Sequence, residues 1–210
     1  MTDAVTYANP LLEAAERMPC RCEYPLVYGP QFGCPMCADG PIGSQEWLDR
    51  HEARWELARK YAWAIPNESA LSAIARLSPI VEIGAGTGYW ASLLAARGAD
   101  IVAYDERPGF NGWRDHEPYH PIAIGGPEVL AAHRDRTLFL CWPPMTDMAA
   151  RCLEHYTGDR LVYIGESDGG CNGDEAFFGA LDREWDEIGT VDIPRWWAIR
   201  DTLVIYGRRA

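Results

Sequence analysis

Short apolar runs and segments with helical spacing follow one another along most of the chain. The apolar runs are rich in β-branched residues and have the length of buried strands. They cover residues 80–83, 100–105, 122–124, 160–165, 188–193 and 202–206, and one more begins at residue 137. One segment with helical spacing precedes them, at residues 68–77, and others lie between them, at residues 91–98, 127–133, 147–156 and 174–185. This order of elements predicts an α/β fold.

A longer helix is predicted ahead of the first strand, over residues 44–62. Ser44 can cap its first turn, and Pro66 restricts the chain just beyond its end. One side of this helix carries a stripe of largely apolar residues, namely Trp47, Leu48, His51, Trp55, Ala58 and Ala62. We expect the stripe to face the core of the protein.

Residues 80–90 carry the strongest functional signal. Their sequence, IVEIGAGTGYW, places three glycines at alternate positions between a strand and a helix. Gly84 lets the chain turn at the end of the strand, Gly86 lets a ligand approach the backbone, and Gly88 permits close packing of the helix. The free N–H groups of the first helical turn then point into the crevice.

Two classes of cofactor are bound by such a turn. Dinucleotide-binding enzymes use G-x-G-x-x-G/A, whereas this chain has G-x-G-x-G, with Tyr89 where the third small residue should fall. Residues 81–90 instead resemble the glycine-rich motif of the class I S-adenosylmethionine-dependent methyltransferases, including an acidic residue, Glu82, two positions before the first glycine. A dinucleotide site and a purely structural turn are the alternatives.

The resemblance implies that Glu82 lies near the methionine end of the cofactor and that the glycine loop wraps around it. Asp105 ends the second strand, where nucleotide-binding α/β folds hold ribose hydroxyls. Its alternative role is that of a solvated carboxylate at the start of a loop. The predicted cofactor-binding residues are therefore Glu82, Gly84, Ala85, Gly86, Gly88, Tyr89 and Asp105.

The fourth strand runs into Trp142-Pro143-Pro144, at the sheet edge that faces the reacting centre in open α/β folds. Amino-methylating enzymes of nucleic acids have a polar residue before the two prolines, so Trp142 counts against nucleobase-amine chemistry. The resemblance also implies that helices before the first strand cover the acceptor pocket. The predicted substrate-binding residues are Tyr61, Trp63, Trp142, Pro143 and Pro144, and simple core packing is the alternative for the aromatic ones.

Glu166 is the candidate catalytic base, because it begins a polar loop after the fifth strand, on the same edge as Asp105 and Trp142. A role as a solvated loop acid or a helix-cap partner is the alternative. Gly125 and Gly126 stand where the family frequently has an acid that binds adenine, so that contact would come from the backbone or from elsewhere.

Four of the seven cysteines are clustered near the N-terminus, at Cys20, Cys22, Cys34 and Cys37. Cys34 and Cys37 form a C-x-x-C pair flanked by glycines, which is typical of a zinc knuckle. Four thiolates would make a closed structural site with no place for substrate. Scattered thiols and disulfides are the alternatives, and reducing conditions in the cytoplasm disfavour disulfides.

The formal charge of −12 disfavours a nucleic-acid partner, because affinity for a phosphate backbone depends largely on cationic side chains. The sequence has no apolar run of membrane length, and its first residues lack the features of a secretory signal. We therefore expect a soluble, cytoplasmic protein without membrane contact.

The sequence thus predicts a doubly wound, mostly parallel, seven-stranded sheet of the class I methyltransferase type. Residues 1–43 would form a small cysteine-rich extension and residues 44–210 the methyltransferase domain, with lid helices at 44–78. The predicted function is methyl transfer from S-adenosylmethionine to a small-molecule acceptor. A nucleic-acid or protein methyltransferase and a non-catalytic S-adenosylmethionine-binding protein are the alternatives.

Overall fold

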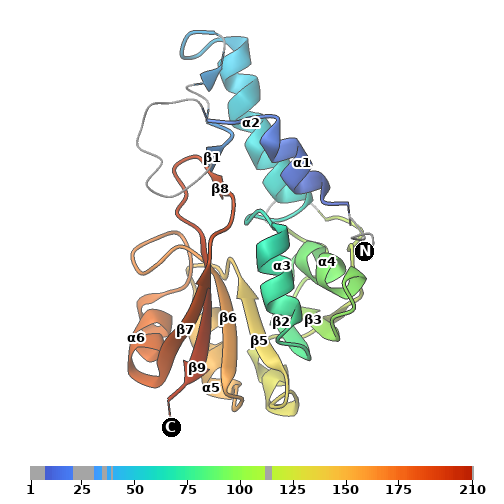
Figure 1. Ribbon diagram of the computed structural model, residues 1–210, viewed down its shortest axis with the longest axis vertical. Helices are drawn as coiled ribbons and strands as arrows, with labels where there is room; N and C mark the ends of the chain where they lie inside the picture. The colour runs from blue at the N-terminus through green and yellow to red at the C-terminus, as the bar shows by residue number, and fades with distance from the viewer. Residues whose placement is uncertain (1–7, 21–30, 35–36, 39, 112–114, 210) are drawn as a thin grey trace, which may run out of the picture.

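A seven-stranded sheet flanked by helices forms the body of the computed structural model, which describes residues 8–20, 31–34, 37–38, 40–111 and 115–209 (Figure 1). In chain order its strands are β2 (Ile80–Ile83), β3 (Ile101–Asp105), β4 (Ile122–Ile124), β5 (Thr137–Cys141), β6 (Arg160–Gly165), β7 (Trp185–Val191) and β9 (Thr202–Arg208). Their order across the sheet is β4-β3-β2-β5-β6-β9-β7.

The sheet is parallel except at β9, which pairs antiparallel with both β6 and β7. The predicted mostly parallel, seven-stranded sheet is therefore confirmed. The order reverses at β2, because β3 lies on one side of it and β5 on the other. In open α/β sheets, ligands bind outside the carboxyl ends of the strands at such a point.

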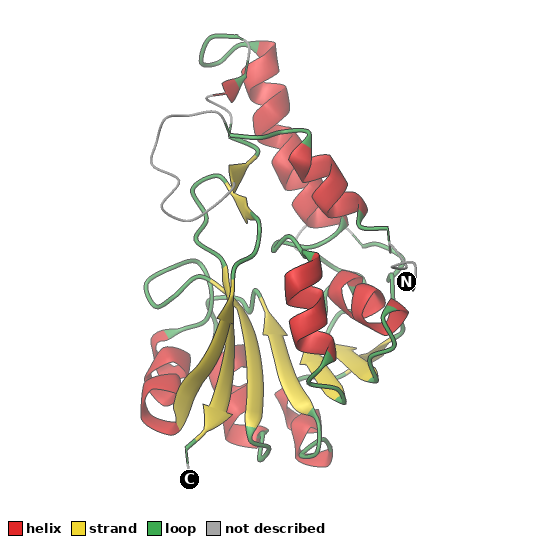
Figure 2. Cartoon of the chain, viewed as in Figure 1, coloured by secondary structure: helices red, strands yellow, loops and turns green. Residues whose placement is uncertain are grey.

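Helices cover both faces of the sheet (Figure 2). The helices are α1 (Pro10–Glu16), α2 (Gln45–Lys60), α3 (Glu68–Ala75), α4 (Tyr89–Ala96), the 3-10 helix η2 (Pro127–Ala132), α5 (Met148–His155) and α6 (Glu175–Glu184). Residues of α1, α3 and α4 pack on one face, and residues of η2, α5 and α6 pack on the other. Successive residues of β5 and β6 point to opposite faces, as strand geometry requires, so both strands are buried on both sides.

Side-chain caps start four of the helices. Asn9, Ser44, Asn67 and Asp174 each accept a hydrogen bond from a backbone N–H in the first turn of α1, α2, α3 and α6. None of the helices in the described part of the chain has the length and apolarity needed to cross a membrane.

Two predictions about helices were wrong. Ala58 is the one buried residue of α2, and Leu48 is 46% exposed, so the predicted stripe does not face the core along its length. Figure 1 shows the cause, since the first half of α2 extends beyond the sheet. The second error concerns Trp185, which begins strand β7 after α6 has ended at Glu184.

The N-terminal segment joins the main core. Leu11 and Ala15 of α1, together with Phe32, belong to the same buried cluster as residues of α3, α4 and the sheet. A two-residue strand, β1 (Gln31–Phe32), also pairs in parallel with β8 (Arg195–Trp196). The segment before α2 is therefore tied to the rest of the protein both by core packing and by strand pairing.

Tyr89 connects α1 to the glycine loop, and this contact yields the first prediction. Its hydroxyl donates a hydrogen bond to Asn9 Oδ1 at 2.8 Å and accepts one from the Leu11 backbone N–H at 3.2 Å. Tyr89→Phe leaves the buried Leu11 N–H without this acceptor and removes one of the two hydrogen bonds that Asn9 Oδ1 accepts, so we expect the free energy of unfolding to fall by about 1–2 kcal/mol in urea denaturation. Tyr119→Phe is the matched control, because Tyr119 is 41% exposed. Equal stabilities of the two variants would contradict the prediction.

Candidate functional site

A cavity of about 650 Å³ opens at the carboxyl ends of β2, β3 and β5. Its volume lies in the range typical of small-molecule sites. Of the predicted cofactor-binding residues, it is lined by Glu82, Gly84, Ala85, Gly86, Tyr89 and Asp105. Of the predicted substrate-binding residues, it is lined by Tyr61, Trp63, Trp142 and Pro144. The structure thus brings the two predicted groups together in one continuous space.

The glycine loop follows β2 and leads into α4. Its three glycines all have positive φ, at +75° for Gly84, +54° for Gly86 and +72° for Gly88. Side chains rarely adopt this left-handed conformation. A Cβ on Gly88 would also lie 3.2 Å from the His120 backbone nitrogen, whereas the nearest atom to a Cβ on Gly86 would be 3.7 Å away. Gly88 therefore serves packing, and Gly86 keeps the cavity open beside the backbone.

Asp105 closes this loop onto the end of β3. Its Oδ2 accepts a hydrogen bond from the Gly86 N–H at 2.8 Å, and its Oδ1 accepts one from the Arg107 N–H at 2.7 Å. Each carboxylate oxygen has capacity for a further hydrogen bond. Asp105 can therefore hold the loop and still accept hydrogen bonds from hydroxyl groups of a ligand in the cavity.

Glu82 is an acid buried at the base of the cavity. Its side chain is only 2% exposed, and within the described part of the chain its Oε2 has no hydrogen-bond partner. Burial, together with the smaller effect of the nearby charge of Asp105, raises the pKa of Glu82 from its usual 4.5 to about 8. A buried oxygen without a partner is costly, and a cationic or hydrogen-bond-donating ligand group would satisfy it.

Tyr61, Trp63 and Trp142 form an aromatic wall of the cavity, and the two tryptophans in it are stacked. The rings of Trp63 and Trp142 stack with centroids 5.4 Å apart and an interplanar angle of 15°. The indole N–H of Trp63 donates to Asn111 Oδ1 at 2.7 Å, and that of Trp142 donates to Asp201 at 2.9 Å. Both indoles are therefore fixed in orientation at the edge of the cavity.

Trp142 also has an unusual backbone conformation, with φ at +54°. Such a conformation costs of order 1–3 kcal/mol for a residue with a side chain, and it is found most often at functional sites. Its partner Asp201 is 1% exposed, and burial raises the pKa of this acid to about 7 against the opposing effect of the Trp142 hydrogen bond. The wall is thus held by a strained residue and a buried acid.

Sequence analysis missed Asn111 and Asp201. Each is remote in sequence from the indole that it orients, by 48 residues for Asn111 and 59 for Asp201. Both lie in irregular segments without a recognisable motif. The only indication is that the two segments leave the carboxyl ends of β3 and β7, which lie at the edge of the sheet where the cavity opens.

Three predicted residues are absent from the described lining of the cavity, namely Gly88, Pro143 and Glu166. Glu166 is 9% exposed, and its carboxylate accepts hydrogen bonds from the N–H groups of Cys171 and Arg200 at 3.0 Å each. The carboxylate is thus engaged in fastening two loops. This placement gives no support to the hypothesis that Glu166 is a catalytic base.

Gly125 and Gly126 stand where the resemblance implies the adenine of the cofactor. Gly125 and Gly126 both line the cavity, and the Gly126 N–H already donates to Glu128 Oε1 at 2.9 Å. Glu106 lies in the same lining, next to Asp105. It is an acid at this end of the cavity that sequence analysis did not select.

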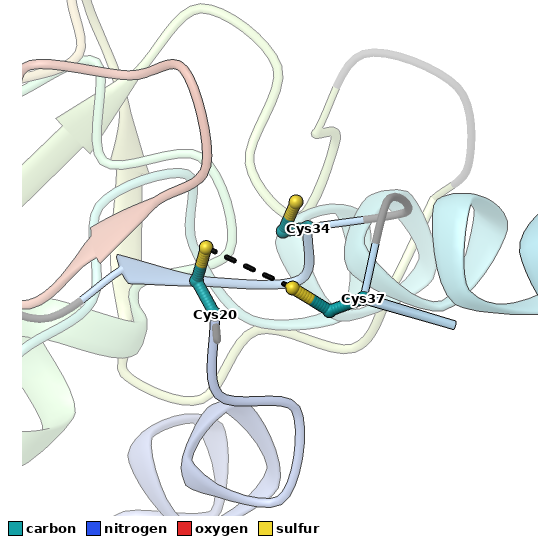
Figure 3. Close-up of side chains that lie close together, drawn as sticks. All are labelled: Cys20, Cys34 and Cys37. Atoms are coloured by element: carbon teal, nitrogen blue, oxygen red, sulfur yellow. Dashed lines mark hydrogen bonds between the residues drawn. The ribbon is translucent and has the colours of Figure 1, made fainter. Parts of the chain in front are cut away.

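The predicted metal ligands lie outside this cavity. The Sγ atoms of Cys20, Cys34 and Cys37 all lie within 4.8 Å of one another (Figure 3). Cys22, the fourth predicted ligand, lies outside the described residues.

No family model matches the chain, and no curated protein matches it in sequence. One solved structure that is similar comes from work on the conversion of a disulfide bond into a thioacetal group during echinomycin biosynthesis. It shares 11% identity over 66% of this chain and 81% of that chain, with a TM-score of 0.41. Another, the pyocyanin biosynthetic protein PhzM, shares 17% identity over 77% of this chain and 59% of that chain, with a TM-score of 0.42.

Similarities of this size carry no argument about activity. The sheet order, the antiparallel β9 and the glycine loop after β2 are observations of this chain itself. Together they match the fold that the resemblance of residues 81–90 to the class I S-adenosylmethionine-dependent methyltransferases implies.

The buried Glu82 yields a prediction about stability and pH. Between pH 4.5 and about 8, the folded state holds a proton on Glu82 that the unfolded state has lost, so wild-type stability falls as pH rises through this window. Glu82→Gln removes this loss. At pH 9 we expect the free energy of unfolding of the variant to be larger than that of the wild type by at least about 1.4 kcal/mol, which is the equivalent of one pKa unit.

The measurement is chemical denaturation without ligand at several pH values, with Glu117→Gln as a control at an exposed acid. At pH 4 the difference between Glu82→Gln and wild type should be smallest. If the free energies of unfolding of variant and wild type differ by the same amount from pH 4 to pH 9, the pKa of Glu82 is not raised by burial, and the prediction is wrong.

Proposed function

We propose that this protein is an S-adenosylmethionine-dependent methyltransferase that acts on a small-molecule acceptor. The observation that supports this proposal is the single cavity in which the glycine loop and two acids meet a wall of aromatic residues. One part of this space suits a charged, hydroxyl-bearing cofactor, and the other suits a largely apolar acceptor.

The residues of the cavity fit the cofactor in three respects. The unpaired Oε2 of Glu82 can accept a hydrogen bond from the ammonium group of the methionine portion. The carboxylate of Asp105 can accept hydrogen bonds from the two ribose hydroxyls, and Gly86 leaves room beside the loop. The bound cofactor supplies a methyl group on a positively charged sulfur, together with its own leaving group.

The aromatic wall would orient the acceptor. Trp63 and Trp142 present rigid apolar surface at the cavity, and Tyr61 adds a third ring. Because a methyl group is transferred by in-line displacement, alignment of the acceptor atom and exclusion of water are the main contributions of these residues. A neutral amine needs no base for this reaction, whereas a hydroxyl needs a proton acceptor within hydrogen-bond reach.

The cofactor assignment is tested by isothermal titration calorimetry with S-adenosylmethionine and with NAD. We expect saturable binding of S-adenosylmethionine alone. Asp105→Ala should weaken that binding by about 10- to 100-fold, because a charge-assisted pair of hydrogen bonds is lost. Asp115→Ala is the control, since Asp115 is an exposed acid that pairs with Arg107 in the adjoining loop. Binding of NAD, or equal affinities for both variants, would refute the assignment.

The acceptor class is tested by transfer of a labelled methyl group in a cell extract that has been separated into small molecules, nucleic acids and proteins. We expect the label in the small-molecule fraction. Trp63→Ala should reduce the rate of transfer of the labelled methyl group by at least about tenfold at low acceptor concentration, while the affinity for the cofactor changes little. Label in nucleic acid or protein would favour those substrates instead, and binding without transfer to any fraction would favour a non-catalytic role.

A further inference from the structure

Three cysteine thiols converge at the junction between the N-terminal segment and α2 (Figure 3). Cys20 follows α1, Cys34 follows β1, and Cys37 completes the C-x-x-C pair before α2. The three Sγ atoms lie within 4.8 Å of one another, and those of Cys20 and Cys37 are 3.9 Å apart. Parts of the chain that are separated in sequence therefore bring their thiols to one point.

The spacing of the sulfurs suits a bound metal better than a disulfide. A disulfide requires about 2.05 Å between sulfurs. A tetrahedral zinc ion with zinc–sulfur bonds of about 2.3 Å holds its ligand sulfurs about 3.8 Å apart. The 3.9 Å separation of Cys20 and Cys37 is close to that second value.

Hydrogen bonds of the described backbone hold the three cysteines near one another. The Cys37 N–H donates to the Cys34 carbonyl at 3.2 Å, which keeps the two ends of the C-x-x-C pair close together. The Cys20 N–H donates to the Gln31 carbonyl at 2.8 Å. Arg50 of α2 donates to the carbonyls of Cys34 at 2.6 Å and Pro19 at 2.7 Å, so it braces both arms.

We propose that Cys20, Cys34 and Cys37 bind one structural zinc ion through their thiolates. Each thiol loses its proton on binding, so three protons are released to solvent. A tetrahedral ion has one coordination position beyond these three. The sequence offers Cys22 for it, although Cys22 lies outside the described residues.

Gly33, the residue before Cys34, lies against Trp196, whose indole is hydrogen-bonded to the Trp63 backbone. A Cβ on Gly33 would lie 3.2 Å from the Trp196 ring, and the Trp196 indole donates to the Trp63 carbonyl at 2.9 Å. The Trp197 N–H donates to the Phe32 carbonyl at 2.8 Å, within the pairing of β1 with β8. A two-residue strand pair has little stability of its own, and the metal would hold β1 in place behind the acceptor wall.

The test is zinc analysis of the full chain purified under reducing conditions. We expect about one zinc per chain in the wild type, and at least a tenfold loss of retained zinc in Cys20→Ser, Cys34→Ser and Cys37→Ser. Cys171→Ser, at an exposed cysteine of the β6–α6 loop, is the control and should keep its zinc. Circular dichroism of each variant shows whether the sheet is still folded.

Replacement of zinc by cobalt provides a readout that does not depend on activity. Thiolate-to-cobalt charge-transfer bands with the intense visible absorption of a tetrahedral site would support the proposal. After removal of the metal, hydrogen exchange at the Gly33 and Trp197 amides should accelerate at least tenfold, while exchange in β2 stays unchanged. A reduced, folded protein that binds neither zinc nor cobalt would overturn the proposal, as would exchange that is indifferent to the metal.

Discussion

The hydrogen bond from the Gly86 N–H to Asp105 Oδ2 is the contact on which the candidate site depends. It joins the loop after β2 to the end of β3 across 19 residues of sequence. The parallel pairing of β2 with β3 brings the two ends together, and the left-handed glycines let the loop turn back far enough to make the contact. The cavity edge is thus a consequence of sheet topology, which sets the same place for ligands in other open α/β folds.

Two buried acids differ in whether their oxygens have hydrogen-bond partners. Asp201 already has its partner in the Trp142 indole, so its burial holds the acceptor wall in place before any ligand arrives. Glu82 has an oxygen with no partner in the described chain, so its burial is a cost that a ligand can relieve. Burial of Glu82 lowers the stability of the folded protein but can strengthen ligand binding. A cationic ligand group beside Glu82 would interact with a carboxylate that water does not screen.

The sequence predicted the parts of this protein whose signals are local. The strands, the glycine loop and Asp105 follow from short patterns, and the structure places them as expected. Contacts between distant segments could not be predicted, since nothing near Trp142 indicates Asp201. Helical spacing in α2 showed an amphipathic pattern but not which part of the helix meets the core. Glu166 was placed on the correct edge, but the direction of its side chain depends on two loops that carry no pattern.

The acceptor wall is assembled from segments that the cofactor loop does not control. Trp63 follows α2 and Trp142 follows β5. Trp196, whose indole donates to the Trp63 carbonyl, belongs to β8, which pairs with the N-terminal strand β1. The glycine loop is also tied to the N-terminal segment, because the Tyr89 hydroxyl is hydrogen-bonded to Asn9 and to Leu11. The N-terminal segment therefore bears on both parts of the cavity, through α1 on the glycine loop and through β1 on the aromatic wall. Because this segment packs into the main core through Leu11 and Phe32, a shift of β1 would also displace β8 and the Trp196 indole that donates to the Trp63 carbonyl.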